Sequence, residues 1–381
     1  MTAVVPRRRA WLRGLDLGLL VATAGLIAFS LAAIASASYS MNPGDRFYFV
    51  RRQALWLAVA LAAGVAARLV DYRLLVAWAA PLYLLNLGLL GAVLVVGREA
   101  QGAQRWIALG PFDFQPSELA KLIVIITLAA HLGRREVPLR GLRDALPYVL
   151  HVSAPLLFVL VQPDLGTSLV LGAVLLGMLY AAGVPGARLA AVMGAGLSVA
   201  ALSIWAHLNW GFPLPLREYQ LNRLLVFLQP GRDPLGAGYH LLQSRIAIGS
   251  GDFWGKGLFY GTQNQLNFLP NRHTDFIFSV IGEELGFAGG IAVLGLYCYL
   301  VYRILRAARL AGDSQGGFLC VGVASMLSFH VLVNVGMTVG IMPITGIPLP
   351  FVSYGGSSLV TSMASVGLVL NVYGRRSRLR F

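Results

Sequence analysis

The sequence predicts an all-α polytopic integral membrane protein with about ten transmembrane helices. Of its 381 residues, 57% are hydrophobic and only 12% are charged, and the mean hydropathy is +0.70. A soluble domain carries about 25% charged residues, so this chain has too little polar surface to face water on all sides. Apolar runs recur along the whole chain, separated by short breaks that carry arginine. These observations predict a single membrane domain over residues 1–381.

The apolar runs define the candidate spans in order. A hydrocarbon core of about 30 Å needs about 20 apolar residues in a helix, and hydropathy with helical period locates such runs. The predicted spans cover residues 15–38, 54–70, 75–97, 118–133, 146–162, 165–182, 186–206, 274–302, 316–340 and 354–374. The first follows a basic stretch but lacks a clear cleavage site, which predicts an uncleaved first helix.

The distribution of positive charge predicts the orientation. The net charge of +14 would suggest a nucleic-acid partner in a soluble protein, but here the arginines cluster at alternate breaks. With the N-terminus in the cytoplasm, most Lys and Arg lie at cytoplasmic ends, as the positive-inside rule expects. The clusters are Arg7 to Arg13, Arg134 to Arg143, Arg303 to Arg309 and Arg375 to Arg380. We therefore expect both termini in the cytoplasm and no nucleic-acid partner.

Other function classes leave no trace in the sequence. The chain has neither a nucleotide-binding loop of the Walker type nor a dinucleotide-binding fingerprint. Its two cysteines, Cys298 and Cys320, lie within predicted spans and show no metal or disulfide spacing. We expect both to be small buried hydrophobic residues.

One long segment, residues 207–273, separates the seventh and eighth spans on the predicted extracytoplasmic side. Aromatic and aliphatic residues recur through it, which argues against disorder. The stretches "REYQLNRLLVFLQP" (217–230) and "YHLLQSRIAIGSG" (239–251) are typical of amphipathic helices at a membrane surface. The alternative is a plain connector. Basic residues concentrate here and suggest an anionic ligand: Arg217, Arg223, Arg232, Arg245, Lys256 and Arg272.

Five acids stand at or inside span ends, where removing a carboxylate from water is costly. They are Glu118, Asp164, Asp275, Glu283 and Glu284. Glu118 and Lys121 are three residues apart on a predicted helix and can pair, either as a structural pair or as ligand contacts. Asp164, in "VQPDLGTS" (161–168), either caps the following helix or serves the function.

Asp275 is the acid at the outer mouth of the eighth span, in "NRHTDFIFSVIGEELG" (271–286). Glu283 lies about 12 Å deeper and about 80° round the helix, and Glu284 about 180° round, so the three do not form one cluster. We expect Asp275 to be the exposed one and Glu284 to be structural. The alternative is that Thr274 or Asp275 only caps the helix.

Two outer links complete the polar set. "GREAQGAQRWIALGPFDFQPSELAK" (97–121) joins the third and fourth spans, and "MPITGIPLPFVSYGGSSLV" (342–360) joins the ninth and tenth. Prolines and glycines in the second break the backbone at membrane depth, which is tolerated only where protein or a water-filled cavity covers it.

Several of these motifs resemble one family. "GAQRWIALG", "QPSELAK", "QPDLGTS", "GTQNQLNFLPNRHTDFIFSVIGEELG" and "GIPLPFVSYGGSS" are similar, in this order, to the motifs of the SEDS family of shape, elongation, division and sporulation proteins. The lead-in "GTQNQLNFLPNRHTDF" is most like that of its rod-shape-determining (RodA) branch.

The resemblance implies a peptidoglycan glycosyltransferase of the bacterial inner membrane, with its active site facing the extracytoplasmic side. It would polymerise lipid II together with a class B penicillin-binding protein and other elongation-complex membrane proteins. The essential aspartate of the family matches Asp275, and Glu118 and Lys121 match positions tied to activity or to the central cavity.

That activity gives the polar residues chemical roles. A sugar hydroxyl is a poor nucleophile, so Asp275 is expected to act as its general base. The departing lipid pyrophosphate needs cations, with bidentate arginine favoured. The predicted substrate-binding residues are Arg105, Glu118, Lys121, Asp164, Arg223, Arg245 and Lys256. One base and an activated leaving group fit inversion at the anomeric carbon. No cofactor is certain; a divalent cation such as Mg²⁺ on the pyrophosphate stays open, although the sequence shows no all-protein metal site.

The main alternative is a transporter. Ten helices with intramembrane carboxylates also describe a lipid II flippase or a carrier for another lipid-linked substrate. Against this, the polar groups gather on one side of the membrane, and the two halves show no internal repeat. A scaffold without activity would leave the buried acids unexplained.

Overall fold

The computed structural model describes residues 14–42, 44–100, 103–109, 112–135, 137–214, 218–229, 231, 233 and 236–376. The N-terminal arginine cluster, Arg217, Arg232, Arg378 and Arg380 lie outside the described residues.

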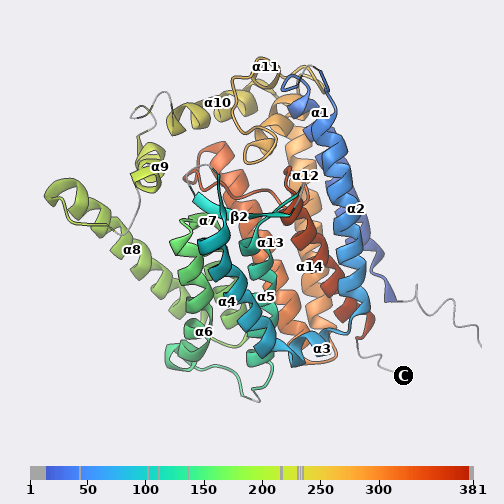
Figure 1. Cartoon of the computed structure of the whole chain (residues 1–381), viewed down its shortest axis with the longest axis vertical. Helices are drawn as coiled ribbons and strands as arrows, with labels where there is room; N and C mark the ends of the chain where they lie inside the picture. Colours follow the sequence, from blue (N-terminus) through green and yellow to red (C-terminus); the bar gives the residue numbers. More distant parts are fainter. Residues whose placement is uncertain are drawn as a thin grey trace, which may run out of the picture.

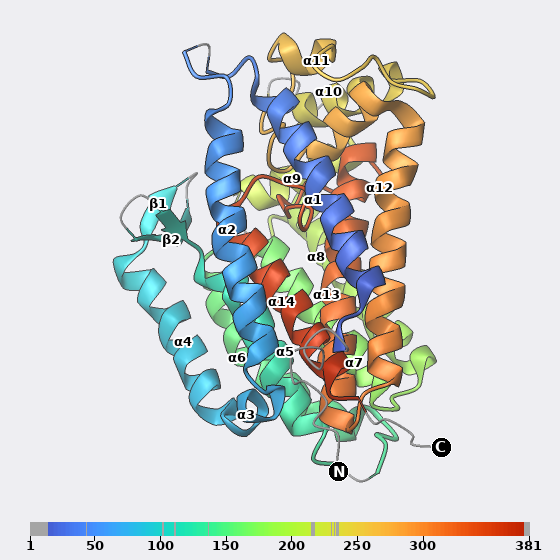
Figure 2. The same cartoon turned by 90° about the vertical axis from the view of Figure 1, so that its right-hand side faces the viewer.

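Each predicted span coincides with a helix (Figures 1 and 2). The helices are α1 (Leu17–Ser38), α2 (Tyr48–Leu69), α4 (Ala79–Val96), α5 (Pro116–Leu132), α6 (Leu142–Val161), α7 (Leu165–Ala181), α8 (Gly186–Trp210), α12 (Ile277–Arg309), α13 (Ser314–Val339) and α14 (Gly356–Gly374). A short helix, α3 (Tyr72–Ala77), precedes α4. Among the described residues, eight helices are long and apolar enough to cross a membrane. The chain is a multi-pass membrane protein, and the number of spans and the side on which the termini lie stay predictions.

The expectation of a purely α-helical chain is wrong in one place. The link between α4 and α5 forms a small antiparallel sheet in the order β1 (Arg98–Ala100), β2 (Ala103–Leu109) and β3 (Phe112–Phe114). This stretch contains Trp106 and Ile107, an aromatic and a β-branched residue of the kinds that are enriched in strands. The sheet carries Arg105 toward the turn between α6 and α7, as the contacts described below show.

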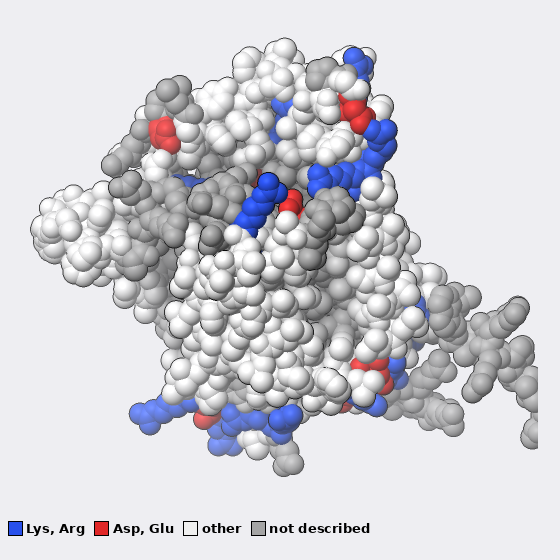
Figure 3. All heavy atoms as spheres, viewed as in Figure 1, with Lys and Arg blue, Asp and Glu red and all other residues white. Residues whose placement is uncertain are grey.

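The start of α1 and the end of α14 meet at one end of the bundle, where Cβ added to Gly14 would lie 3.2 Å from Cα of Gly374. The helices α10 and α11 lie at the opposite end (Figure 2). Lys and Arg gather along the lower end in Figure 3, below a broad band of uncharged surface, and further Lys and Arg stand above the band beside Asp and Glu. An uncharged band between two charged ends is what a membrane protein needs.

The described part of the long segment between α8 and α12 is largely helical. It contains α9 (Glu218–Leu228), α10 (Ala237–Ser250) and α11 (Thr262–Gln265), and the first two confirm the helices expected from the apolar spacing. The helix α10 is fixed to the bundle through Ser244, whose hydroxyl lies 2.6 Å from that of Ser279 and donates to the Thr338 carbonyl at 2.7 Å.

The eighth predicted span is not one continuous helix. The helix α12 is broken at Gly286, where φ is 65° and ψ is −164°, a backbone conformation that glycine adopts most readily. The backbone of the preceding loop fills the break. The N–H of Phe287 donates to the Asp252 carbonyl at 2.9 Å, and the N–H of Lys256 donates to the Glu283 carbonyl at 3.0 Å. Loop and helix are thus interleaved.

Candidate active site

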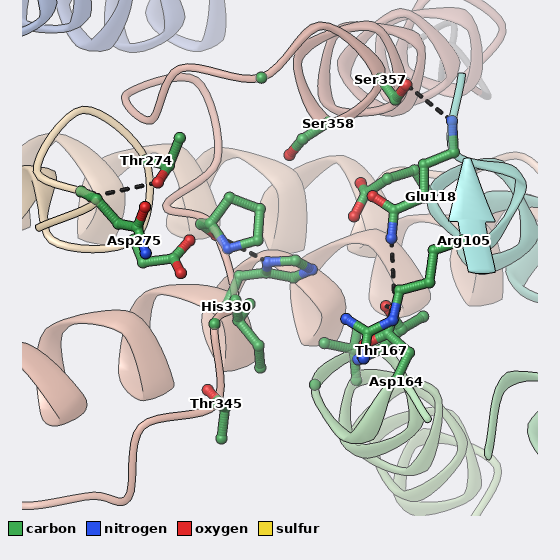
Figure 4. Close-up of a pocket in the computed structure, with 18 of the residues that line it drawn as sticks. Arg105, Glu118, Asp164, Thr167, Thr274, Asp275, His330, Thr345, Ser357 and Ser358 are labelled. Atoms are coloured by element: carbon green, nitrogen blue, oxygen red, sulfur yellow. Dashed lines mark hydrogen bonds between the residues drawn. The ribbon is translucent and has the colours of Figure 1, made fainter. Parts of the chain in front are cut away.

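A cavity of about 260 Å³ lies where α5, α7 and α14 begin, against the chain that leads into α12 (Figure 4). Its wall brings together residues that are far apart in the sequence. They include Arg105 of β2, Glu118 of α5, Asp164 before α7, Arg223 of α9 and Asp275 before α12. These predicted site residues therefore share one space.

Asp275 is held at the cavity wall by its backbone. The side-chain amide of Asn334 donates to the Asp275 carbonyl at 2.9 Å and to the Ile347 carbonyl at 2.8 Å. This joins the start of α12 to the link between α13 and α14. Cβ added to Gly346 would lie 3.5 Å from the Asp275 carboxylate and 3.6 Å from a guanidinium nitrogen of Arg223. The carboxylate and the guanidinium thus both lie close to the space beside Gly346 that a side chain would fill.

The surroundings of Asp275 change its acidity. Burial raises the pKa of Asp275 to about 6, while the charge of Arg223 opposes that rise. The side chain is half-buried, whereas Glu283 and Glu284 are fully buried, so the expected order of exposure is confirmed. Neither Thr274 nor Asp275 caps α12, because its N-cap is Phe276, which makes no side-chain cap bond.

Glu118 and Lys121 form the expected pair, and a histidine extends it. The Lys121 ammonium lies 2.8 Å from the Glu118 carboxylate and 3.1 Å from Nε2 of His330, and Nδ1 of His330 lies 3.1 Å from the Pro348 carbonyl. A carbonyl only accepts, so Nδ1 carries the proton and Nε2 accepts from Lys121. Glu118 and His330 line the cavity, while Lys121 lies behind them. Sequence reasoning missed His330, since a lone histidine in an apolar helix carries no signal.

Asp164 both caps α7 and lines the cavity. Its carboxylate accepts from the backbone N–H of Thr167 at 3.1 Å, from the Thr167 hydroxyl at 2.9 Å and from the Gln115 amide at 3.3 Å. The capping interpretation is therefore confirmed. Arg105 is fixed beside it, because Nε donates to the Gln162 carbonyl at 3.1 Å and Nη2 donates to the Pro163 carbonyl.

The structure does not bring Arg245 and Lys256 to this cavity. Lys256 pairs with the buried Glu283 carboxylate at 2.8 Å and donates to Thr262 at 2.9 Å. Arg245 is exposed on α10, with its side chain next to Gly340. Their contact with substrate stays a prediction, and nothing in this geometry supports it.

Residues of the link between α13 and α14 were singled out only as a broken stretch of backbone. The link is fixed to the start of α12, because the Ser353 hydroxyl donates to the Thr274 carbonyl at 2.6 Å and the Tyr354 N–H donates to the His273 carbonyl at 2.9 Å. Tyr354 and Ser358 line the cavity. The prolines and glycines of this link were the available signal, but they could not tell which side chain faces inward.

Comparison with known proteins identifies the family of this chain. The FtsW, RodA and SpoVE family, described as cell cycle proteins, matches residues 16–378. The peptidoglycan glycosyltransferase MrdB of Escherichia coli K12 is 39% identical over 365 residues, which span 96% of this chain and 95% of MrdB. The probable peptidoglycan glycosyltransferase FtsW of Trichlorobacter lovleyi is 39% identical over 363 residues, which span 94% of this chain and 92% of that protein.

A solved structure gives the same result. One chain of a peptidoglycan synthase complex, described as coordinating polymerization and crosslinking, superposes with a TM-score of 0.78 at 36% identity. The match covers 94% of this chain and 97% of that chain. With the motifs, the cavity and both comparisons in agreement, the chain belongs to the SEDS family of FtsW-, RodA- and SpoVE-type proteins.

Proposed function

We propose that this peptidoglycan glycosyltransferase polymerises lipid II in the Asp275 cavity by a single displacement. The Asp275 carboxylate takes the proton of the acceptor hydroxyl as its oxygen attacks the anomeric carbon of the donor. The bond from that carbon to the lipid pyrophosphate breaks, its electron pair leaves with the pyrophosphate, and the configuration inverts. A general base works best when its pKa is near the operating pH, and the raised pKa of Asp275, about 6, fits that requirement.

The same cavity contains arginine side chains that could bind the departing pyrophosphate. Negative charge builds on the pyrophosphate as the bond breaks, and prearranged cations stabilise it most. Arg223 lies next to Asp275, and Arg105 stands on another part of the wall. The guanidinium fork suits two phosphate oxygens. The proposal is carried by one observation, that the Asp275 carboxylate and the Arg223 guanidinium lie close together beside Gly346 at the wall of one cavity.

A divalent cation would enter with the substrate. No group of three or more His, Cys, Asp and Glu side chains that could hold a metal ion occurs in the described part of the chain. Mg²⁺ commonly binds through substrate phosphates with only one or two carboxylates, and Asp164 or Glu118 could supply one. When bound, the cation would neutralise pyrophosphate charge.

The comparisons support a partner and leave the branch open. One similar chain belongs to a peptidoglycan synthase complex of polymerization and crosslinking, which supports a class B penicillin-binding protein as partner. MrdB and FtsW relatives are equally identical to this chain at 39%. The role in elongation is therefore proposed from the "GTQNQLNFLPNRHTDF" lead-in.

The test is lipid II polymerisation by purified protein, with and without its cognate class B penicillin-binding protein, read as glycan strands on a gel. We expect strands from the pair. In parallel, the same protein in vesicles with fluorescent lipid II would report transfer of the lipid between leaflets. Transfer without strands, with a folded partner present, would favour the flippase instead.

Labelling tests the side on which the cavity opens. Trp254 is 79% exposed in the loop before α11, so Trp254→Cys, in a background with Cys298 and Cys320 replaced by serine, should react with an impermeant thiol reagent in intact cells without an outer-membrane barrier. The background without the new cysteine is the control. Reaction only after permeabilisation would put the cavity on the cytoplasmic side.

A further inference from the structure

Three helices begin at the cavity, and one of them differs from the others. A helix N-terminus presents N–H groups without partners and the positive end of the helix dipole. Asp164 caps α7, and Glu118 lies in the first turn of α5, so both ends are already compensated by acids. The helix α14 has Gly355 as its N-cap, with no side-chain cap bond and no acid in its first turn.

Ser358, in the first turn of α14, has a polar group without a partner. Its side chain lines the cavity and only 9% of the residue is exposed. Its hydroxyl has no hydrogen-bond partner among the described residues, and in Figure 4 it points into the cavity. The neighbouring Ser357 differs, because its hydroxyl accepts from the Gln115 N–H at 3.1 Å and donates to the Asp113 carbonyl at 3.3 Å. The Ser358 hydroxyl is therefore open to the cavity and free to form a hydrogen bond with a ligand that enters it.

The backbone adds donors at the same place. The first three N–H groups of α14 have no acceptor in the described part of the chain, since the first intrahelical bond runs from Leu359 to the Gly355 carbonyl at 3.1 Å. On its other side the turn is packed so closely that Cβ added to Gly356 would collide with the Trp56 ring. A turn of this kind, with N–H donors and a hydroxyl, suits phosphate oxygens.

We propose that the first turn of α14, residues Gly356 to Ser358, is a second pyrophosphate subsite, which holds the pyrophosphate of the acceptor lipid II. The proposal rests on the proposed function, because that reaction brings two lipid-linked pyrophosphates to one cavity. The departing pyrophosphate gains charge and needs the guanidinium groups of Arg105 and Arg223. The acceptor pyrophosphate keeps its charge throughout, so uncharged donors are enough to position it.

The test measures one transfer with donor and acceptor varied separately, using the full-length protein with its partner. The donor-only lipid is lipid II with its acceptor hydroxyl blocked. The acceptor-only lipid is a lipid II analogue whose anomeric oxygen is replaced by a methylene group, which keeps the pyrophosphate charge but cannot be displaced. Ser358→Ala removes a hydrogen bond to a charged group and should raise the KM for the acceptor about tenfold. Ser358→Asp should raise it further by repulsion, without a lower Tm, because an acid in the first turn stabilises a helix. The KM for the donor should not change.

Ser365→Ala is the matched control on the same helix. The Ser365 hydroxyl donates to the Thr361 carbonyl at 2.7 Å and does not line the cavity, so neither KM should change. A wild-type protein that makes no transfer would refute the proposed function itself. A normal wild-type rate, together with an unchanged acceptor KM in both Ser358 variants, or with an increase confined to the donor, would overturn only the subsite.

Discussion

Asp275 and the pair Glu283–Glu284 are close in sequence, yet their surroundings are opposite. Glu283 accepts from the Lys256 ammonium at 2.8 Å and from the Gln263 N–H at 2.9 Å, and Glu284 accepts from the Ser36 hydroxyl at 2.6 Å. Both glutamates are fully buried. Asp275 instead faces the cavity beside Arg223.

The comparison shows how the same chemical group, a carboxylate, serves two purposes. Donors arranged around a carboxylate stabilise its charged form and fix its position. Glu283 and Glu284 are therefore anchors that hold the loop before α12. A carboxylate with little such support gives up less when it takes a proton, and Asp275 is placed to do so.

Replacing one acid of each kind should give the largest contrast. Asp275→Asn should lower polymerisation by about 10²–10⁴-fold, the usual contribution of a general base, at a Tm no lower than that of the wild type. Glu283→Gln should instead lower stability and leave activity intact. It leaves Lys256 without its counter-charge and should cost about 3 kcal/mol of stability, with the activity of the folded fraction retained. Glycan gels and thermal unfolding measure both. A stable but inactive Glu283→Gln protein would show that Glu283 is not a purely structural carboxylate.

The pair of Glu118 and Lys121 shares features with both kinds of carboxylate. It is buried, as Glu283 and Glu284 are, but Glu118 lines the cavity, as Asp275 does. Glu118→Ala and Lys121→Ala should each cost about 3–5 kcal/mol, because each leaves a buried charge unpaired. The double variant should cost far less than the sum of the two. Thermal unfolding and polymerisation should be measured on all three proteins. Additive losses would show that the two residues act separately.

Two arginines of the segment between α8 and α12 differ in the same way, because one lines the cavity and the other does not. Arg223 lines the cavity, whereas Arg245 is exposed on α10. Arg223→Lys keeps the charge but loses the two-pronged hydrogen bonding, so polymerisation should fall about tenfold. Arg245→Lys is the matched control and should stay near the wild-type rate, with protein level and partner binding intact in both. Equal losses would bring Arg245 into the substrate site.

The pH dependence tests Asp275 without a change to its neighbours. Because the pKa of Asp275 is about 6, polymerisation should fall about tenfold per pH unit below 6. Stability should change in the opposite direction. The folded pKa lies above the ordinary value of 3.8, so this group stabilises the fold as the pH falls through 6 toward 4, and that stability is lost as the pH rises through 6. Asp275→Asn should remove its share of the Tm change, which rate and Tm measurements across pH 4–8 would show.

Hydropathy and helical spacing were enough to predict the spans, α9 and α10, because apolar periodicity is a local signal. The pairing of Glu118 with Lys121 was predictable for the same reason. The sequence could not tell Arg223 from Arg245, since the two stand in similar stretches and only the packing of α9 and α10 decides which one reaches the cavity. The sequence also could not predict that His330 and Ser358 line the cavity. Their positions there depend on segments that are distant in the sequence and pack against them.

The break in α12 has a consequence for how such proteins can be recombined. The backbone of residues 252–257 supplies acceptors and donors to the turns on both sides of Gly286, so this stretch belongs to the helix as much as to the loop. Loop exchange between family members should therefore succeed only when residues 252–288 are transferred as one block. A junction placed at the visible start of α12 would separate two halves of a single folding unit.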